Sequence, residues 1–171
     1  DLMQSNGTLT SWPEVAKAVV IANARHNLEG SSIPPSYEDA KDGWGGVDFM
    51  RSNWTLSNYY GSWYSGSITC DMTMPYNISM NLTAPYVTRV AFVWDNNPDY
   101  PNYANEPNMD LDISIIDPNG NYITASSRYD STVETVSFNP SVTGTYTLRI
   151  NRFRCDPTYN FTWFGAAWQQ S

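Results

Sequence analysis

The chain is poor in positive charge and in histidine, and it has no long apolar run. Nine Lys and Arg stand against 17 Asp and Glu among its 171 residues, which gives a formal net charge of −8 and a pI near 4.3. A nucleic-acid partner would favour a basic face, so this balance argues against one. No apolar stretch approaches the roughly 20 residues that a membrane span requires. Residues 1–3 do not have the pattern of a signal peptide.

Cysteine is also scarce, and Cys70 and Cys155 are the two that occur. Both lie in or beside strands of the β-sandwich that the sequence predicts (see below), where they can be neighbours in space. We predict a disulfide, which would contribute about 4 kcal/mol in the chain-entropy model for a separation of this length. Free buried thiols are the alternative, which a cytosolic location would favour. Two cysteines and one distant histidine do not make a plausible metal site.

Residues 1–55 carry the only helical signal. Ser11 and Glu14 have the spacing of a capping box, and Pro13 falls in the first turn, where its missing N–H costs nothing. A stripe of small apolar residues follows at i, i+3, i+4 and i+7: Val15, Ala18, Val19 and Ala22. Such a stripe suits packing against a sheet, but residues 1–55 offer none. We therefore expect the stripe to lack its proper partner, so that the helix docks on the sandwich, pairs with another copy, binds a separate chain or frays.

From about Tyr59 the pattern changes to period two, as at residues 78–82, where apolar residues alternate with Asn and Ser. Turn signals rich in Pro, Asn and Gly separate the alternating runs: 84–85, 96–98, 117–120, 139–140 and 143–144. This pattern predicts a mainly β fold, an antiparallel β-sandwich of about eight strands with a jelly-roll-like topology, preceded by a short α-helical segment. Trp94 and Trp163 follow the alternation and are predicted to lie in the core.

Several sequence blocks resemble the subtilisin-like serine proteases, or subtilases. The helix of residues 11–24 and the stretch DGWGGVDFM at 42–50 are similar to the closing segment of a subtilase catalytic domain. Four later blocks resemble the β-sandwich domain that follows the catalytic domain in many subtilases: RVAFVWD at 89–95, MDLDISIIDPNGN at 109–121, VETVSF at 133–138 and TGTYTLRI at 143–150. The loop at 95–109 is longer than the loop that usually precedes the family's DLDL strand.

The resemblance implies that the chain is the non-catalytic C-terminal portion of a subtilisin-like serine endopeptidase. Residues 1–56 would end the catalytic domain, and residues 57–171 would form an accessory sandwich that stabilises it and assists substrate or surface binding. The Asp, His and Ser of the triad would lie upstream. The only histidine, His26, lacks the family's HGTH surroundings, so we expect the chain alone to be inactive. The implied partners are the catalytic domain, in the parent chain or as a separate chain, and a peptide or protein substrate of the parent.

Five carboxylates crowd one loop and the start of the strand that follows it: Asp95, Asp99, Glu106, Asp110 and Asp112. Amide side chains lie between them, and hard oxygen ligands of this kind suit Ca²⁺, which takes six to eight of them. The carboxylates would repel one another without a cation. The spacing is not that of an EF-hand, and a hydrated acidic loop is the alternative. The resemblance to subtilases, which often bind structural Ca²⁺, adds to the calcium hypothesis.

Aromatic residues make up 15% of the chain. Several do not fit the alternating core pattern: Trp54, Tyr59, Tyr60, Trp63, Tyr64, Tyr100 and Tyr103. Exposed rings on a β-sandwich can stack on sugar rings, because an aromatic ring presents a flat apolar face. This is the basis of a second hypothesis, an independent carbohydrate- or surface-binding module. The alternative is that these rings pack against a neighbouring catalytic domain, since large aromatic side chains are enriched at interfaces.

The overall profile predicts an extracellular or otherwise exported protein. N-x-S/T sequons begin at five positions, Asn6, Asn53, Asn77, Asn81 and Asn160. They would carry glycans only in a eukaryotic secretory pathway, and they also arise by chance in a chain rich in Asn and Thr.

Overall fold

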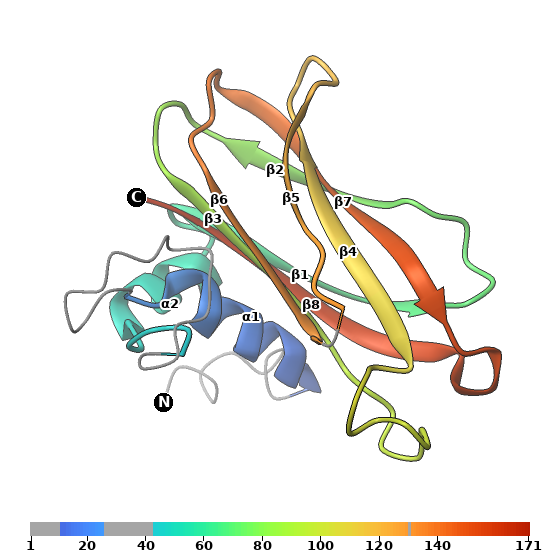
Figure 1. Ribbon diagram of the computed structural model, residues 1–171. Coiled ribbons are helices and arrows are strands. Elements are labelled where there is room, and N and C mark those ends of the chain that lie inside the picture. Colours follow the sequence, from blue (N-terminus) through green and yellow to red (C-terminus); the bar gives the residue numbers. More distant parts are fainter. Residues whose placement is uncertain (1–10, 26–42, 130) are drawn as a thin grey trace.

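Two sheets packed face to face make up most of the molecule (Figure 1). The computed structural model describes residues 11–25, 43–129 and 131–171. Within them the chain forms two α-helices, eight strands and a 3₁₀ helix: α1 (Pro13–Asn23), α2 (Phe49–Leu56), β1 (Gly61–Thr69), β2 (Tyr76–Leu82), β3 (Thr88–Trp94), β4 (Met109–Ile116), β5 (Tyr122–Ser126), β6 (Val133–Phe138), β7 (Gly144–Cys155), η2 (Pro157–Tyr159) and β8 (Phe161–Gln170). The predicted mainly β fold with a short helical segment before it is confirmed. Neither described helix is long and apolar enough to cross a membrane.

The strands form two antiparallel four-stranded sheets in the order of a jelly roll. The first sheet runs β1-β8-β3-β6 and the second runs β2-β7-β4-β5. Apart from the β4–β5 pair, neighbouring strands come from distant parts of the chain, as Greek-key connections require. The predicted antiparallel sandwich with jelly-roll-like topology is therefore confirmed. β1 and β2 are edge strands on one side of the sandwich, and β6 and β5 are edge strands on the other.

The core lies between the sheets and is built from alternate residues of each strand. On β4, Leu111, Ile113 and Ile115 are fully buried, and each such side chain contributes about 1.5–3 kcal/mol by leaving water. Trp94 of β3 is also in the core, as predicted. Its indole N–H donates to the Met109 carbonyl at 2.9 Å, so the one polar atom of this ring is not left without a partner.

Trp163 does not lie in the core, contrary to the prediction. Its side chain is 44% exposed on the outer face of β8, whereas Phe164 and Trp168 face the core. Successive residues of a strand face opposite sides, so a register that differs by one residue reverses the assignment. Trp163 instead packs edge-on against Trp12, with 5.0 Å between the ring centroids, and against Phe161.

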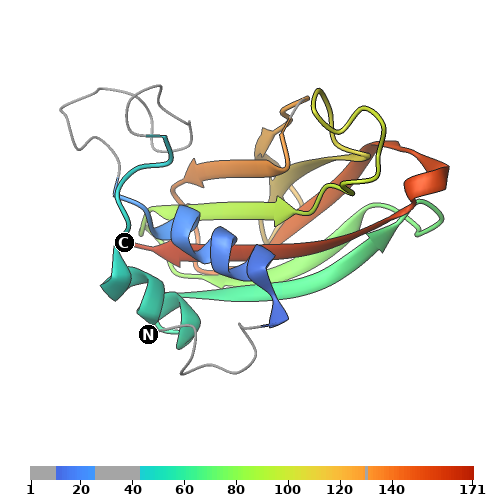
Figure 2. The same ribbon diagram turned by 90° about the horizontal axis from the view of Figure 1, so that it is seen from below.

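Helix α1 lies across the outer face of the first sheet, over β3 and β8 (Figure 2). All four residues of its apolar stripe are at most 3% exposed. They pack against small apolar side chains on that outer face: Ala91, Val93, Val133 and Ala167. β3 is therefore buried on both faces, by the core on one side and by α1 on the other. The helix docks on the sandwich, and the expectation that its stripe lacks a proper partner within the chain is wrong.

The close approach of α1 to the sheet depends on a glycine of β8. A Cβ atom at Gly165 would overlap backbone atoms of Glu14 and Val15 at the start of the helix. Only a residue without a side chain leaves room for the helix backbone at this point. The outer face of β8 is thus shaped to receive α1.

Helix α2 is held between α1 and β1. Asp48 caps it by accepting a hydrogen bond from the Arg51 N–H at 3.1 Å and forms an ion pair with Arg25 at 2.7 Å. The Thr55 hydroxyl donates to Asn23 of α1 at 3.1 Å, where both residues are buried. The predicted domain boundary at residue 56 coincides with the end of α2. It stays a prediction, because two domains of one chain can also pack in this way.

Cys70 and Cys155 form a disulfide, as predicted, with their Cα atoms 5.7 Å apart. Cys70 directly follows β1 of the first sheet, and Cys155 ends β7 of the second. Arg152 of β7 also donates hydrogen bonds to the carbonyls of Thr69 and Met72 beside the disulfide. This end of the sandwich is therefore tied together by both a covalent bond and charge-assisted hydrogen bonds.

Candidate functional site

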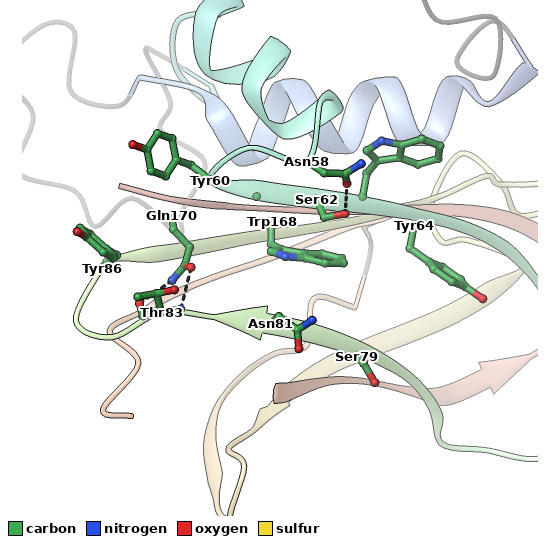
Figure 3. Close-up of a pocket in the computed structure, with 12 residues that line it drawn as sticks. Asn58, Tyr60, Ser62, Tyr64, Ser79, Asn81, Thr83, Tyr86, Trp168 and Gln170 are labelled. Carbon is green, nitrogen blue, oxygen red and sulfur yellow. Dashed lines mark hydrogen bonds between the residues drawn. The ribbon is translucent and has the colours of Figure 1, made fainter. Parts of the chain in front are cut away.

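A groove of about 620 Å³ lies where the edge strands β1 and β2 face each other (Figure 3). One wall comes from β1 and the turn before it, the other from β2 and the turn after it, and β8 lies between them. The lining residues are Asn58, Tyr60, Gly61, Ser62, Trp63, Tyr64, Ser79, Asn81, Thr83, Tyr86, Trp168 and Gln170. None of these side chains is charged, although the chain as a whole carries a net charge of −8.

Trp168 of β8 forms the floor of the groove. Its ring lies between the β1 and β2 walls in Figure 3, and the residue is 6% exposed because its other side packs into the core. Tyr64, 38% exposed, lies further along β1, and its ring stacks on Phe164 with an interplanar angle of 20°. The groove thus has flat aromatic surfaces that the core holds in place.

The turn between α2 and β1 places Asn58 and Tyr60 at the groove in an unusual backbone conformation. Both residues have a φ of 56°, in the left-handed region, which is common for Asn and uncommon for Tyr. The turn is held from both sides. The Gln170 N–H donates to the Tyr60 carbonyl at 2.6 Å, and the Tyr59 N–H donates to the Trp54 carbonyl at 2.7 Å. A strained backbone that the surrounding structure holds in this way is typical of binding sites.

Two amide side chains face the groove from opposite walls. The Ser62 hydroxyl donates to Oδ1 of Asn58 at 2.5 Å, and the Thr145 hydroxyl donates to Oδ1 of Asn81 at 2.9 Å. These bonds assign the orientation of both amides. Within the described part of the chain, the Nδ2 group of each amide has no protein partner, so each presents N–H donors to a ligand.

Gln170 ties the two walls together at one end of the groove. Its side-chain oxygen accepts from the Thr83 N–H at 2.9 Å, and its side-chain nitrogen donates to the Thr83 carbonyl and the Thr88 hydroxyl, each at 3.0 Å. Gln170 belongs to the first sheet and Thr83 to the turn after β2 of the second. The side chain of Gln170 therefore acts as a structural bridge, and it holds the Tyr86 turn against β8.

The aromatic residues predicted to bind a ligand fall into two regions. Tyr60, Trp63 and Tyr64 line the groove, while Trp54 and Tyr59 pack behind the Tyr60 turn as edge-on rings. The other two lie in the loop after β3 and do not line the groove: Tyr100, whose hydroxyl donates to Glu106 at 2.9 Å, and Tyr103, which is 57% exposed.

Sequence reasoning missed Trp168, Tyr86, Asn58 and Asn81. Trp168 shares its strand face with core residues, so its sequence position gives no sign of a ligand site. Asn81 alternates with apolar residues and has the pattern of an ordinary outward-facing polar residue. The sequence did carry one signal, which is the aromatic and Asn content of the turn before β1 and of β2 with the turn after it. That these two segments lie close together depends on the topology.

The five carboxylates predicted to bind calcium are not brought together. Asp99 lies in an exposed turn, and Asp95 faces Glu14 of α1. Glu106 forms an ion pair with Arg154, and hydrogen bonds from Asn102, Tyr100 and Arg154 lower the pKa of its carboxyl to about 2. Asp110 and Asp112 sit on β4, where burial raises the pKa of Asp112.

Among the described residues, no three or more of His, Cys, Asp and Glu form a group that could hold a metal ion. The calcium prediction took no account of basic residues. Arg154 lies on β7, the neighbour of β4, and its guanidinium forms an ion pair with Glu106 that offsets part of the negative charge. Calcium binding at the 95–112 segment stays a prediction, which melting curves with chelator and with Ca²⁺ can test.

Comparisons with known proteins find resemblance among solved structures alone. No protein-family model matches the chain, and neither does any curated protein. PliG from Aeromonas hydrophila, a periplasmic inhibitor of g-type lysozyme, has a TM-score of 0.40 at 10% identity, over 66% of this chain and 87% of PliG. PliG from Salmonella Typhimurium has a TM-score of 0.37 at 16% identity, over 66% of this chain and 88% of its own. The carbohydrate-binding module CBM36, solved with calcium and xylotriose, has a TM-score of 0.34 at 12% identity, over 63% of this chain and 88% of CBM36. Likeness at this level carries no argument about what this chain binds.

Proposed function

We propose that this chain is a non-catalytic carbohydrate-binding domain and that the β1–β2 groove holds the sugar. The observation that carries the proposal is the lining of the groove, which combines aromatic rings with amide and hydroxyl groups and has no charged side chain. A sugar ring has apolar C–H faces that stack on aromatic rings, and hydroxyl groups that hydrogen-bond to amides and hydroxyls. Ligand sites of small molecules typically combine such flat apolar surfaces with a few placed polar groups.

The docking of α1 favours this hypothesis over a purely structural role beside another domain. The stripe of Val15, Ala18, Val19 and Ala22 was the part of the chain expected to need a sheet from an upstream domain, and it is covered by β3 and β8. The exposed rings of the groove lie on a different part of the surface from this stripe. Export of the protein is part of the proposal, since the Cys70–Cys155 disulfide is favoured in an oxidising compartment.

The test is binding of the purified chain to a panel of immobilised glycans, followed by titration with the best ligand. Tyr86→Ala should weaken binding by roughly tenfold, because loss of a stacking ring costs about 1–2 kcal/mol. Tyr122→Ala is the matched control. Tyr86 and Tyr122 are 52% and 63% exposed, but Tyr122 lies on β5 at the far edge of the second sheet. Equal loss in both variants, or no binding to any glycan, would refute the proposal.

A second candidate is an accessory domain of a subtilisin-like protease, which does not exclude sugar binding. It is supported by the four sequence blocks that resemble the subtilase sandwich, because each block falls on one strand: β3, β4, β6 and β7. In that case the catalytic triad, the catalytic domain as partner and the peptide substrate would all belong to the upstream part of the parent protein. The test is the coding sequence upstream of residue 1, where a subtilase would carry its G-T-S serine motif shortly before this chain. Unrelated sequence there would end this candidate.

A further inference from the structure

The charge of the groove limits the sugars that fit it. An acidic sugar, carrying a carboxylate or a sulfate, is normally recognised by Arg or Lys through charge-assisted hydrogen bonds. The groove lining contains no Arg, Lys or His, and the protein that surrounds it has 17 acidic against nine basic residues. An anionic ligand would therefore gain no ion pair in the groove and would be repelled by the field of the whole molecule.

The hydrogen-bonding groups of the groove are complementary to sugar hydroxyls. Asn58 presents Nδ2 donors from the turn before β1, and Asn81 presents Nδ2 donors from β2, since the oxygen of each amide already accepts from Ser62 or Thr145. The hydroxyl oxygen of a sugar is an acceptor with two lone pairs. A ligand that accepts from both amides spans the gap between the sheets, and a neutral hydroxyl needs no counter-ion to do so.

The length of the groove exceeds one sugar ring. Along β2 and the turn after it the lining residues run from Ser79 to Thr83, and these four residue-to-residue steps of extended chain cover about 13 Å. The aromatic surfaces are spread over this length. Tyr60 and Tyr86 lie towards one end, Tyr64 lies towards the other, and Trp168 lies between them in Figure 3. A ligand that contacts all of these rings must be a chain of sugars.

From these three observations we infer that the ligand is an uncharged oligosaccharide of more than one unit, which lies along the β1–β2 groove and accepts hydrogen bonds from Asn58 and Asn81. This inference rests on the proposed function and names its ligand class. A neutral chain stacks its rings on the aromatic surfaces and bridges the two sheet edges through its hydroxyls.

The experiment is calorimetric titration with neutral cello-, xylo- and manno-oligosaccharides, from monomer to hexamer, and with oligogalacturonates of the same lengths as acidic counterparts. At least one neutral series should bind at least tenfold more tightly than the acidic series, gain affinity beyond the monomer, and bind equally well at low and high NaCl. Tighter binding of the acidic series that weakens with salt, and depends on Tyr86, overturns the inference while the proposed function stands. A monomer that binds as well as the longest chain overturns it as well. Failure of every sugar at the groove refutes the proposed function itself.

A single-atom change tests the role of the amides. Asn81→Asp keeps an oxygen that accepts from Thr145 but replaces the Nδ2 donors with a charged acceptor, so the fold is retained and the donor is lost. Affinity for the neutral chain should fall at least tenfold with an unchanged melting temperature. Asn160→Asp, at an exposed site between η2 and β8 at the disulfide end of the sandwich, adds the same charge at a residue that does not line the groove and should bind as the unmodified chain does. Unchanged affinity in Asn81→Asp, or an equal loss in Asn160→Asp, would overturn the inference.

Discussion

At the scale of single residues, the fold buries two carboxyl groups that titrate near neutral pH. Burial and a hydrogen bond with Asp95 raise the pKa of Glu14 to about 7. Burial also raises the pKa of Glu134 to about 7, against hydrogen bonds from the Ser126 hydroxyl and the Arg128 N–H, which lower it. A group whose folded-state pKa lies above its unfolded value of 4.5 contributes its full stability below that value. That contribution is lost as the pH rises through the folded-state pKa.

We therefore predict that the free energy of unfolding falls between about pH 4.5 and pH 7, by roughly 1–3 kcal/mol for each buried group. Glu134→Gln keeps the shape of the side chain and removes its titration, so denaturant unfolding of this variant should show a smaller fall. Glu106→Gln is the control. Hydrogen bonds, of which the one from Asn102 has the largest effect, lower the pKa of Glu106 to about 2, so this carboxyl stays ionised over the whole range. A fall of unchanged size in Glu134→Gln would contradict the account.

Tyr60 gives a second prediction at this scale. Its φ of 56° disfavours any residue with a Cβ, by about 1–2 kcal/mol. Tyr60→Gly relieves this strain and Tyr60→Ala does not, while both lose the ring contact with Trp54. In denaturant unfolding, the free energy of unfolding of the Gly variant should therefore exceed that of the Ala variant by about 1 kcal/mol. Both should bind the sugar more weakly. An Ala variant as stable as the Gly variant would show that the turn is not left-handed at Tyr60.

At the scale of elements, the docking of α1 depends on Gly165. Gly165→Ala forces a Cβ against the helix backbone, and we predict a loss of about 1–3 kcal/mol in stability, with α1 amides exchanging faster while β4 amides keep their protection. Gly144→Ala is the matched control, because a Cβ there meets only the ring of Pro118. Slow exchange of α1 in the Gly165→Ala variant would show that the helix does not lie against β8.

The disulfide gives a prediction for the two sheets as elements. Replacing both Cys70 and Cys155 by Ser removes a link across 85 residues, and the chain-entropy model then predicts a loss of about 4 kcal/mol in the free energy of unfolding. Intact mass with and without reductant, after alkylation of the denatured protein, checks the bond itself. Two thiols that alkylate without reductant would contradict it.

The strands show how far sequence reasoning reaches at the scale of elements. Alternation located β2, β3, β4, β6 and β7, because the side chains that face the core between the sheets recur at every second residue of a strand. Alternation did not identify the partner of α1. β3 is apolar on both faces, and its alternate residues Val90, Phe92 and Trp94 already account for its prediction as a strand with one face in the core. Trp163 was misplaced for a related reason, since a bulky apolar residue can cover the outer face of a sheet as well as fill the core.

At the scale of the whole molecule, the two open sides of the sandwich differ in chemistry. The β1–β2 side has the aromatic, uncharged groove. The β5–β6 side has a smaller cavity of about 310 Å³ lined by short side chains and Arg128, with no aromatic ring. The sequence could not show that β1 and β2 form one side of the sandwich. Their positions at the sheet edges depend on their pairing with β8 and β7, which the jelly-roll topology sets. The single residues Tyr60 and Tyr64 were identified as candidates, but the groove that unites them with Asn81 and Trp168 was not.

The most direct test of the central claim is a titration of the ¹⁵N-labelled chain with the neutral oligosaccharide that binds best, followed by amide chemical shifts. Sugar binding in the β1–β2 groove predicts the largest shifts at residues 58–64 and 79–86 and at the Trp168 indole N–H. Amides of the β5–β6 cavity, such as Ser127, should not move. Shifts that gather at the β5–β6 cavity or in the 95–109 loop, or no shifts with any glycan of the panel, would contradict the assignment of this groove as the binding site.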